Sequence, residues 1–432
     1  MKKVYSVMLS VILISVLVLS AAGCGGQKAE EGFVPRMDKD YECSIIIEGS
    51  YKNFEALEAE FDLFREYYPS VELKFVTLDD YNNTISVALS GDDAPDIYQM
   101  YDWMVGRDTY QKLFDCAEDL SDSSLGIDFS VFREHLVVKA EDGSVPMLPV
   151  FSSTHGMLVN EDLFEQYGIG IPSTYEELFS ACESFRAAGI KDPIMGFNGN
   201  FRNSAYYYLV YPYFVSMCQN DPGMTEALNS LDPSAGEYLR GLLEMVKDMD
   251  DRGLIDLTSM ESISDNYNAV IMRFFEGDVP MMIASGDTVS GTAKRESQSE
   301  AFSASPFTYA LYPVPVGADG GFFADVPSIQ FAVNKNSSEL DMANEFIRFL
   351  MSRDELNRMA AVKRLVTPTT DLSFDSIYAP FGSVPAEHTV NPQEAGISDS
   401  VTLQVRYMIY HVTLGDMSID EAVKGYGSFE IR

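Results

Sequence analysis

The stretch CSIII at residues 43–47 opens a series of alternating strand and helix patterns that decides the fold class. Short runs of β-branched residues are typical of buried strands. Apolar side chains then recur at spacings of three and four over residues 54–68, which predicts a helix, and VELKFV at 71–76 alternates as a second strand does. A helix pattern around 81–89 and the strand-like DIYQMY at 96–101 follow. This order predicts a doubly wound α/β fold with ligand sites at the carboxyl ends of the strands.

The length and charge of the chain limit which architectures and which partners are possible. A chain of 432 residues predicts two lobes, because a single hydrophobic core stops growing near ~250–300 residues. The apolar fraction of 46% and the charged fraction of 22% are those of a globular protein. However, 30 Lys and Arg against 66 Asp and Glu give a net charge of −36. Binding of phosphates requires clustered Lys and Arg, so we expect no nucleic-acid partner.

The rest of the chain continues the mixture of strands and helices. PMLPV at 146–150 is an extended, proline-flanked segment at which the chain can leave the first lobe. STYE at 173–176 has the pattern of a capping box and predicts the start of a helix. Residues 206–300 are mostly helical in pattern, and TYALY at 308–312 and SIQFAV at 328–333 are predicted strands. No repeat of fixed period is visible in the sequence, which excludes a solenoid.

The N-terminus has the pattern of an export signal. A basic start precedes a long apolar run, which predicts a secretory signal peptide over residues 1–23. The run is nearly long enough to span a bilayer, so an uncleaved membrane anchor is the alternative. AAGC at 21–24 resembles the lipobox of bacterial lipoproteins, except that Ala21 stands where leucine is usual. This resemblance implies that Cys24 is the lipidated first residue of the mature chain. Residues 24–40 mix Gly, Glu and Lys without an apolar period, which predicts a flexible tether.

Four further cysteines, Cys43, Cys116, Cys182 and Cys218, form no C-x-x-C pair, so the motifs of zinc ribbons and redox proteins are absent from the sequence. Cys182 lies on the apolar face of a predicted helix, which favours a buried free thiol. An exported protein permits disulfides, and their presence among these four residues stays open. The four histidines are far apart in sequence, and we expect neither a metal nor a cofactor.

Catalytic motifs are also missing from the sequence. The patterns G-x-S-x-G, H-E-x-x-H, G-x-x-x-x-G-K-[ST] and S-x-x-K are absent, which disfavours an enzyme. A glycosidase needs only two carboxylates about 5–9.5 Å apart, and the chain has 66 candidates. A carbohydrate-active enzyme therefore stays the alternative to a binding protein.

The segment NEDLFEQYGI at 160–169, which runs into IPSTYEEL at 171–178, resembles a pattern of extracellular solute-binding protein family 1. The members of this family are substrate receptors of ABC importers and include maltose-binding protein. Glu161 stands where the family usually has lysine, and Tyr175 where it has tryptophan. Four further stretches agree with the family in the same order: SGDDAPDI at 90–97, FFEGDVPMMIASG at 274–286, residues 334–352 and GDMSIDEA at 415–422.

The resemblance implies a two-lobed periplasmic-binding-protein-like fold of type II, in which hinge crossings join two doubly wound lobes and solute binds in the interlobe cleft. Carried over by position, the first lobe holds residues 41–150 and 325–370, and the second holds 151–324 and 371–432. We expect a lipid-anchored monomer on the extracytoplasmic face of a bacterial membrane that captures a sugar or oligosaccharide and delivers it to the permease of an ABC importer. The alternative is a surface-anchored glycoside hydrolase or another secreted carbohydrate-active enzyme.

The predicted ligand site consists of residues on loops at the ends of strands and helices, each of which can instead cap a helix or pack locally. The first lobe is expected to contribute Glu48, Ser50, Tyr51, Asn53, Tyr101, Asp102 and Trp103, and the first crossing Ser152 and His155. The second lobe is expected to contribute Asn198, Asn200, Arg202, Tyr206, Ser285, Asp287 and Thr288, and the return crossing Phe323 and Asp325.

The aromatic and basic residues of these loops narrow the expected solute. Trp103 is the single tryptophan of the chain and follows a predicted strand at its carboxyl end, where an indole can present its face to a sugar ring. The alternative is that Trp103 begins a core-facing stripe that continues to Tyr110 at helical spacing. The candidate loops hold few basic residues, namely Lys52, Arg107 and Arg202. A strongly anionic solute is therefore disfavoured, whereas an amino sugar or another cation stays open.

Overall fold

The computed structural model of this protein describes residues 33–50, 57–91, 93–105, 107–140, 142–257, 266–372 and 374–431. The predicted signal peptide, the lipidation site Cys24 and the predicted ligand residues Tyr51 and Asn53 lie outside these ranges.

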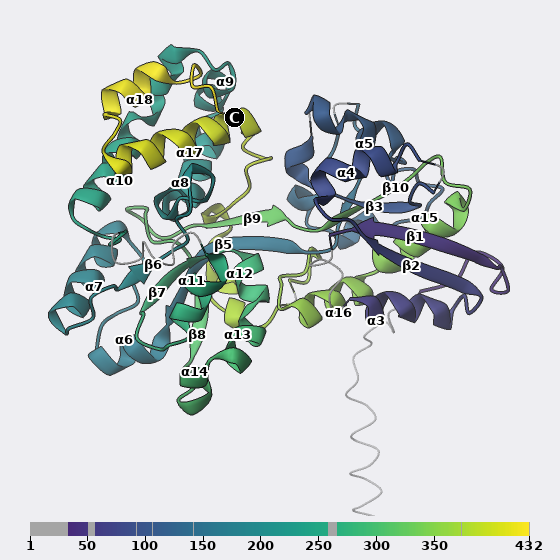
Figure 1. Ribbon diagram of the computed structural model, residues 1–432, viewed down its shortest axis with the longest axis horizontal. Coiled ribbons are helices and arrows are strands. Elements are labelled where there is room, and N and C mark those ends of the chain that lie inside the picture. Colours follow the sequence, from purple (N-terminus) through teal and green to yellow (C-terminus); the bar gives the residue numbers. More distant parts are fainter. Residues whose placement is uncertain are drawn as a thin grey trace, which may run out of the picture. The chain divides into compact units, whose positions relative to one another are not determined.

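The first sheet contains the three strands that the opening of the sequence predicts. It has the order β2-β1-β3-β10-β4 (Figure 1). Its strands are β1 (Cys43–Gly49), β2 (Val71–Thr77), β3 (Ile97–Met100), β4 (Leu148–Pro149) and β10 (Gln330–Val333). β1 pairs in parallel with β2 and β3, whereas β10 is antiparallel to β3 and β4. Ile45 and Ile47 of β1 are fully buried, as a short β-branched run predicts.

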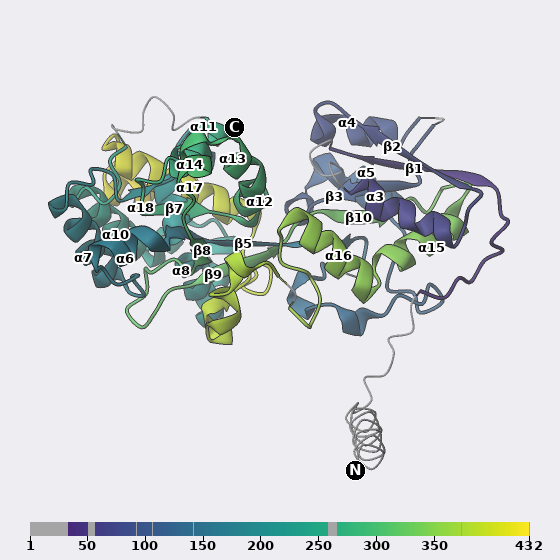
Figure 2. The same cartoon turned by 90° about the horizontal axis from the view of Figure 1, so that it is seen from below.

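Short helices accompany this sheet. They are α3 (Glu58–Phe61), α4 (Tyr81–Ala88), α5 (Gln111–Cys116), α15 (Leu340–Leu350) and α16 (Arg353–Lys363). α15 packs against β10, and α16 packs against α3 (Figure 2). In the described part of residues 54–68, α3 ends at Phe61 and a 3₁₀ helix continues over Asp62–Glu66, so the predicted helix is broken. Such a tighter turn is common at a helix terminus, and here Phe61 and Phe64 both stay buried.

The second sheet contains five strands that the sequence patterns did not indicate. It has the order β11-β9-β5-β7-β6, and β8 pairs with β5. Its strands are β5 (Ser152–Asn160), β6 (Ile194–Met195), β7 (Met281–Ala284), β8 (Tyr309–Tyr312), β9 (Phe323–Pro327) and β11 (Thr389–Val390). β8 matches the strand predicted at 308–312, whereas β5, β6, β7, β9 and β11 have no predicted counterpart. β5 begins with SSTH, polar residues that pair with β9, so its sequence lacks the apolar alternation of a half-buried strand.

Most helices of the chain surround the second sheet. They are α6 (Glu161–Tyr167), α7 (Tyr175–Ala187), α8 (Ala205–Asn220), α9 (Pro222–Asn229), α10 (Arg240–Asp251), α11 (Tyr267–Phe274), α12 (Gly286–Ser290), α13 (Thr292–Gln298), α14 (Glu300–Ala304), α17 (Asp399–Leu414) and α18 (Ile419–Gly425). The cap predicted at 173–176 lies one residue further on, because Thr174 rather than Ser173 is the N-cap residue of α7. The hydroxyl of Thr174 accepts from the N–H of Glu177, and the Glu177 carboxylate accepts from the N–H and hydroxyl of Ser173 at 2.8 and 2.7 Å.

A continuous antiparallel ladder joins the two sheets. Residues 148–155 run through β4 into β5 and pair with residues 324–331, which run through β9 into β10. Between the paired strands the N–H of Val150 donates to the carbonyl of Ile329 at 2.8 Å. A third crossing segment joins at Val366, whose carbonyl accepts from β5 at 3.0 Å. These crossings confirm a two-lobed fold, and the predicted lobe boundaries stay a proposal because residue 325 lies within β9.

The cysteines Cys43, Cys116, Cys182 and Cys218 are all free thiols. Cys182 is fully buried in the core of the second lobe, which confirms the interpretation of its helical position, and burial raises the pKa of its thiol to about 12. In the described part of the chain, no group of three or more His, Cys, Asp or Glu is placed to hold a metal ion. Over the same residues, no helix combines the length and the apolar character that a membrane span requires.

Candidate functional site

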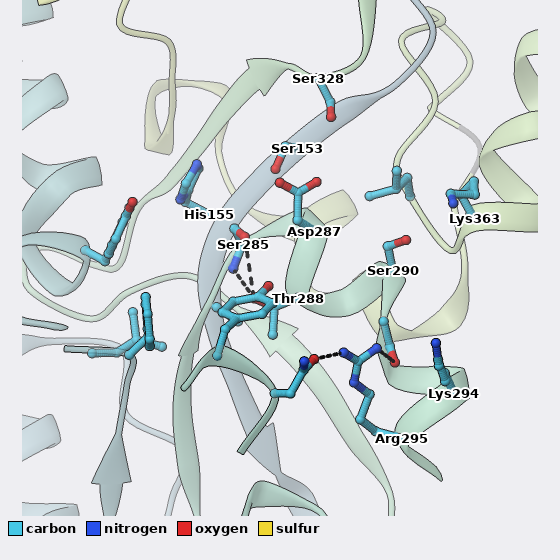
Figure 3. Close-up of a pocket in the computed structure, with 18 of the residues that line it drawn as sticks. Ser153, His155, Ser285, Asp287, Thr288, Ser290, Lys294, Arg295, Ser328 and Lys363 are labelled. Atoms are coloured by element: carbon cyan, nitrogen blue, oxygen red, sulfur yellow. Dashed lines mark hydrogen bonds between the residues drawn. The ribbon is translucent and has the colours of Figure 1, made fainter. Parts of the chain in front are cut away.

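A cavity of about 910 Å³ lies beside the crossing ladder and is lined by both lobes (Figure 3). Tyr101 follows β3 of the first sheet, Ser153 and His155 belong to β5, and Ser328 lies on the return crossing. The other walls come from α8, α11, the segment from β7 to α13, and the end of α16. This volume is in the usual range for small-molecule sites, and a molecule bound in it contacts both lobes at once.

An aromatic wall forms one side of the cavity. The rings of His155 and Tyr208 stack with centroids 5.9 Å apart and planes 8° from parallel, and Tyr211 meets His155 edge-on at 5.3 Å. The Arg406 guanidinium lies 5.5 Å from the Tyr208 ring centroid. Burial, and then the charge of Arg406, lower the pKa of His155 to about 4, against the opposing effect of Asp325. The imidazole is therefore neutral at pH 7, so it offers one donor and one acceptor to a ligand.

The start of α12 forms the polar centre of the cavity. Ser285 and Thr288 form a capping box, in which the Ser285 N–H donates to the Thr288 hydroxyl at 3.4 Å. The hydroxyl of Tyr267 lies 2.7 Å from that of Thr288. Gly286 lets this turn approach β5, because a Cβ atom at this position would lie 2.9 Å from the Cα atom of Ser153. Several hydroxyl groups therefore converge on one spot of the wall.

The charged side chains on the cavity wall are mostly basic. Lys294 and Arg295 belong to α13, and Lys363 is the last residue of α16 (Figure 3). Among the lining residues that the structure describes, Asp287 is the only carboxylate. Burial raises the pKa of Asp287, and the charge of Lys363 opposes this rise.

The basic residues of the cavity are not those counted on the candidate loops. Arg107 forms an ion pair with Asp399, Arg202 lies 4.9 Å from the ring centroid of Phe201, and Lys52 is outside the described residues. None of these three lines the cavity in the described structure. The expectation of a site poor in cations is corrected, because helices rather than loops supply its basic side chains.

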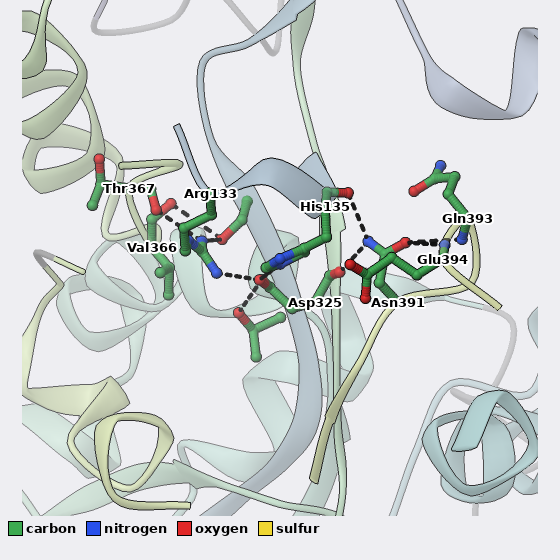
Figure 4. Close-up of polar contacts among 10 residues, drawn as sticks. Arg133, His135, Asp325, Val366, Thr367, Asn391, Gln393 and Glu394 are labelled. Carbon is green, nitrogen blue, oxygen red and sulfur yellow. Dashed lines mark hydrogen bonds and ion pairs between the residues drawn. The ribbon is translucent and has the colours of Figure 1, made fainter. Parts of the chain in front are cut away.

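A buried polar network holds the crossing segments together (Figure 4). Asp325 of β9 is fully buried, forms an ion pair with Arg133, and has its Oδ2 atom 2.9 Å from Nε2 of His135. Arg133 also donates at 2.8 Å to the Ser152 hydroxyl and at 2.8 Å to a carbonyl of the third crossing segment. The side-chain amide of Asn391 donates to the Asp325 carbonyl at 2.8 Å. Burial alone would raise the pKa of Asp325, but Arg133 and His135 outweigh it and hold this pKa below its ordinary value.

Residues 48–355 match the model of a family described as bacterial extracellular solute-binding protein. The match begins at the end of β1 and includes the crossing ladder and most of the elements that line the cavity. The chain belongs to this family. Its membership confirms the resemblance seen in the sequence, and also the expectation of a solute-binding protein rather than an enzyme.

Similar proteins cover nearly the whole of this solute-binding chain. The melibiose/raffinose/stachyose-binding protein MelE of Bacillus subtilis is 20% identical over 371 residues, which are 85% of this chain and 83% of MelE. The structure of apo RafE from Streptococcus pneumoniae has a TM-score of 0.67 and 16% identity, covering 92% of this chain and 98% of RafE. The GacH receptor of Streptomyces glaucescens has a TM-score of 0.67 and 18% identity, covering 90% and 97%. At these identities, the likeness to the two structures shows the fold.

The residues predicted for the ligand site fall into several groups. One group lines the cavity of the solute-binding protein: Tyr101, His155, Ser285, Asp287 and Thr288. These five come from the end of a first-lobe strand, from the crossing strand and from the turn after β7. They are the part of the predicted map that the structure brings together.

The two residues after Tyr101 make contacts outside the cavity. The carboxylate of Asp102 accepts from the Gln393 amide, and burial, opposed by this hydrogen bond, raises the pKa of Asp102 to about 6. Trp103 stacks on Tyr101 with centroids 5.6 Å apart and meets Tyr110 edge-on at 5.3 Å. Its packing against the core of the first lobe matches the alternative of a core-facing stripe, and Tyr101 is the ring that lines the cavity.

The second-lobe loop after β6 serves mainly as a structural support. Asn198 accepts from the backbone at the start of α8 at 3.1 Å, and Asn200 accepts from the N–H of Arg202 at 2.9 Å. Tyr206 is fully buried in the core and does not reach the cavity, which corrects its predicted role. Residues two positions apart on an α-helix point about 200° away from each other. Tyr208 therefore lines the cavity where Tyr206 does not.

The remaining predicted residues are placed in the core or at the crossings. Glu48 is 6% exposed, and burial raises the pKa of its carboxyl, while the N–H of Ser50 donates to the Gln99 side chain at 3.2 Å. Phe323 is fully buried against Phe381, which corrects its predicted contact with ligand. Ser152 and Asp325 belong to the buried network of the crossings and are also wholly enclosed, so their predicted direct contact is corrected to a structural role.

Sequence reasoning missed several residues of the cavity: Tyr208, Tyr267, Lys294, Arg295 and Lys363. They lie on helices, whereas the rule for ligand sites at strand ends points to the loops that follow strands. One signal was present, because adjacent basic residues at 294–295 and 363–364 stand out in a chain with 66 acidic residues.

Proposed function

We propose that this chain is the sugar-binding receptor of an ABC importer, which captures a saccharide in the cavity between its lobes and delivers it to a membrane permease. The observation that carries this proposal is a cavity in which stacked rings, converging hydroxyl groups and both lobes meet. Aromatic faces suit the C–H surfaces of sugar rings, and polar side chains fix the hydroxyl groups. The printed names of relatives support it: MelE is a melibiose/raffinose/stachyose-binding protein, and RafE is known in complex with raffinose.

The crossing segments supply a mechanism for capture. A ligand that touches both lobes stabilises the arrangement in which all of its contacts are made, and hinge closure follows from this differential affinity. Tyr101 and Lys363 reach the cavity from the side of the first sheet, whereas His155 and Asp287 reach it from the second. Micromolar capture corresponds to about 8 kcal/mol, which a set of hydrogen bonds and ring contacts can supply.

A glycoside hydrolase fits the cavity less well. Such enzymes use two carboxylates about 5–9.5 Å apart on either side of the scissile bond. Among the described residues that line the cavity, Asp287 is the only acidic one. We therefore infer a receptor that releases its ligand unchanged.

Binding without turnover is the expected result for the mature chain. Calorimetry with raffinose, stachyose and other oligosaccharides should give one-to-one saturation by at least one sugar, which is recovered intact and raises the melting temperature. Tyr208→Ala should weaken that binding at least tenfold, about 1.4 kcal/mol. Tyr238→Ala is the matched control, since Tyr238 is 48% exposed and lies outside the cavity. Cleavage of the sugar, or no binding by any saccharide, would contradict the proposal.

Attachment to the outer face of the cell membrane through Cys24 is part of the same proposal. It rests on the small residues at 21–23 and on membership of an extracellular family. Cys24→Ser should leave the chain unprocessed or release it from the membrane fraction, and Cys43→Ser should not. Metabolic labelling with a palmitate analogue, followed by fractionation, measures both effects. Unchanged labelling and retention of the Cys24 variant would exclude the lipid anchor.

A further inference from the structure

The charge on the cavity wall is opposite to that of the chain as a whole. The chain has more than twice as many acidic as basic residues, 66 against 30. The described wall has Lys294, Arg295 and Lys363 against the single carboxylate of Asp287. Asp287 and Lys363 act on one another, so the wall has no described carboxylate for Lys294 and Arg295 of α13. The wall is therefore matched to a ligand that brings negative charge of its own.

The contacts of Arg295 strengthen this reading. Arg133, Arg273 and Arg364 each form an ion pair with a carboxylate, which is the common state of an arginine in this acidic chain. Arg295 instead donates to the amide oxygen of Asn268 and, at 3.2 Å, to a backbone carbonyl. Within the described residues, no carboxylate lies within ion-pair distance of it. Its guanidinium is thus held in place by neutral oxygens, and among the described residues its charge has no carboxylate partner beside the cavity.

The positions of the charged groups divide the cavity into two ends. Figure 3 shows His155 on one side, Lys294 and Arg295 on the other, and Asp287 between them. Lys363 opposes the burial-induced rise in the pKa of Asp287, so these two charges act on one another. Lys294 and Arg295 on α13 are the cavity cations that can bind an anionic group of the ligand. A sugar ring stacked on the aromatic wall can therefore point an acidic substituent toward α13.

We propose that the solute is an acidic saccharide, whose anionic group binds Lys294 and Arg295 while a neighbouring sugar ring contacts the aromatic wall. This inference rests on the proposed sugar-binding function and names the class of sugar. A uronate is favoured among acidic sugars, because the planar guanidinium fork matches the two oxygens of a carboxylate. A sulfated sugar shares the negative charge but lacks the planar geometry.

Matched pairs of acidic and neutral disaccharides test this class directly. Calorimetry on the mature chain compares digalacturonate with α-1,4-galactobiose, dimannuronate with β-1,4-mannobiose, and cellobiouronate with cellobiose. At least one uronate should bind ten times more tightly than its neutral counterpart. Sodium chloride at 0.5 M should weaken the binding of that uronate severalfold relative to 0.05 M, because salt screens the ion pair. A sulfated galactobiose serves as the arm that separates carboxylate from sulfate.

Substitutions locate the effect on the cavity wall. Arg295→Met should reduce the preference for the uronate from tenfold or more to less than threefold. Arg273→Met is the control, since Arg273 lies on the neighbouring α11, pairs with Asp278 and does not line the cavity. Its preference should equal that of the wild type, and melting curves verify that both variants fold.

The outcomes separate this inference from the proposed function. If neutral disaccharides bind as tightly as every acidic counterpart, the acidic class is wrong and the sugar receptor stands. If only the sulfated sugar binds more tightly than its neutral counterpart, the anionic site stands, and the proposed ligand is a sulfated sugar rather than a uronate. If no saccharide of either kind binds, the sugar receptor itself fails, and this inference fails with it.

Discussion

Replacing Asp325 with asparagine is expected to lower the free energy of unfolding by about 3–5 kcal/mol, because it leaves the charge of Arg133 buried without a partner. The side chain of Asp325 is fully buried and that of Arg133 is 9% exposed. The loss should also loosen the hinge, since Arg133 reaches Ser152 of β5 and a carbonyl of the third crossing segment through the same guanidinium. Urea unfolding of the mature chain at pH 7 measures the change.

The pH dependence of stability gives this ion pair a distinct signature. The pKa of Asp325 is held below its ordinary value in the folded protein, so the unfolded chain binds the proton first as the pH falls. The stabilisation is therefore fully present above pH ~4, near the unfolded pKa, and is lost as the pH falls through the folded pKa. The Asp325→Asn variant should lack this part of the acid destabilisation.

A surface ion pair provides the control for Asp325. Asp420 is 67% exposed and pairs with Arg240, so Asp420→Asn should change the free energy of unfolding by less than ~1 kcal/mol. A change of the same small size for Asp325→Asn would show that the buried network does not stabilise the crossings.

The first sheet could be predicted from the sequence because its strands carry their own signal. β1 is a β-branched run and β2 alternates, so local patterns suffice to place both of them. β5 is different, because it opens with Ser152 and the polar residues that follow it, which become buried only through pairing with β9, more than 160 residues away. The local pattern of apolar and polar residues cannot indicate pairing with so distant a strand.

The same limit applies to the candidate site. Tyr101 and Asp287 follow strands, and the general rule for ligand sites at strand ends was sufficient to predict them. Arg295 and Lys363 lie on separate helices, and only the tertiary fold brings them to one cavity. Arg133 and Asp325 are 192 residues apart and meet at the crossings. Sequence reasoning therefore predicted the polar centre of the cavity and missed its basic wall and its buried support.

Replacing Arg406 with methionine is expected to raise the pKa of His155, because the charge of Arg406 is the second cause, after burial, of its fall to about 4. The imidazole should not titrate between pH 8 and pH 5 in the wild type, whereas the variant should titrate higher but still below the ordinary value of ~6.5. The folded pKa lies below the unfolded one, so the unfolded chain binds the proton first. Stability from this group is present above pH ~6.5 and is lost as the pH falls toward 4. Arg406→Met should narrow the pH range over which this stability is lost, because it brings the folded pKa of His155 closer to the unfolded one.

Histidine NMR signals measure this titration, and His155→Gln assigns the signal among the four histidines of the chain. Arg252→Met is the matched control, because Arg252 also lies over an aromatic ring, that of Phe179, but away from the cavity. It should leave the titration of His155 unchanged. A wild-type midpoint near 6.5 would refute the neutral state assigned to this imidazole. An unchanged midpoint in Arg406→Met would instead show that burial alone lowers the pKa of His155. The charge of Arg406 would then have no part in keeping this imidazole neutral.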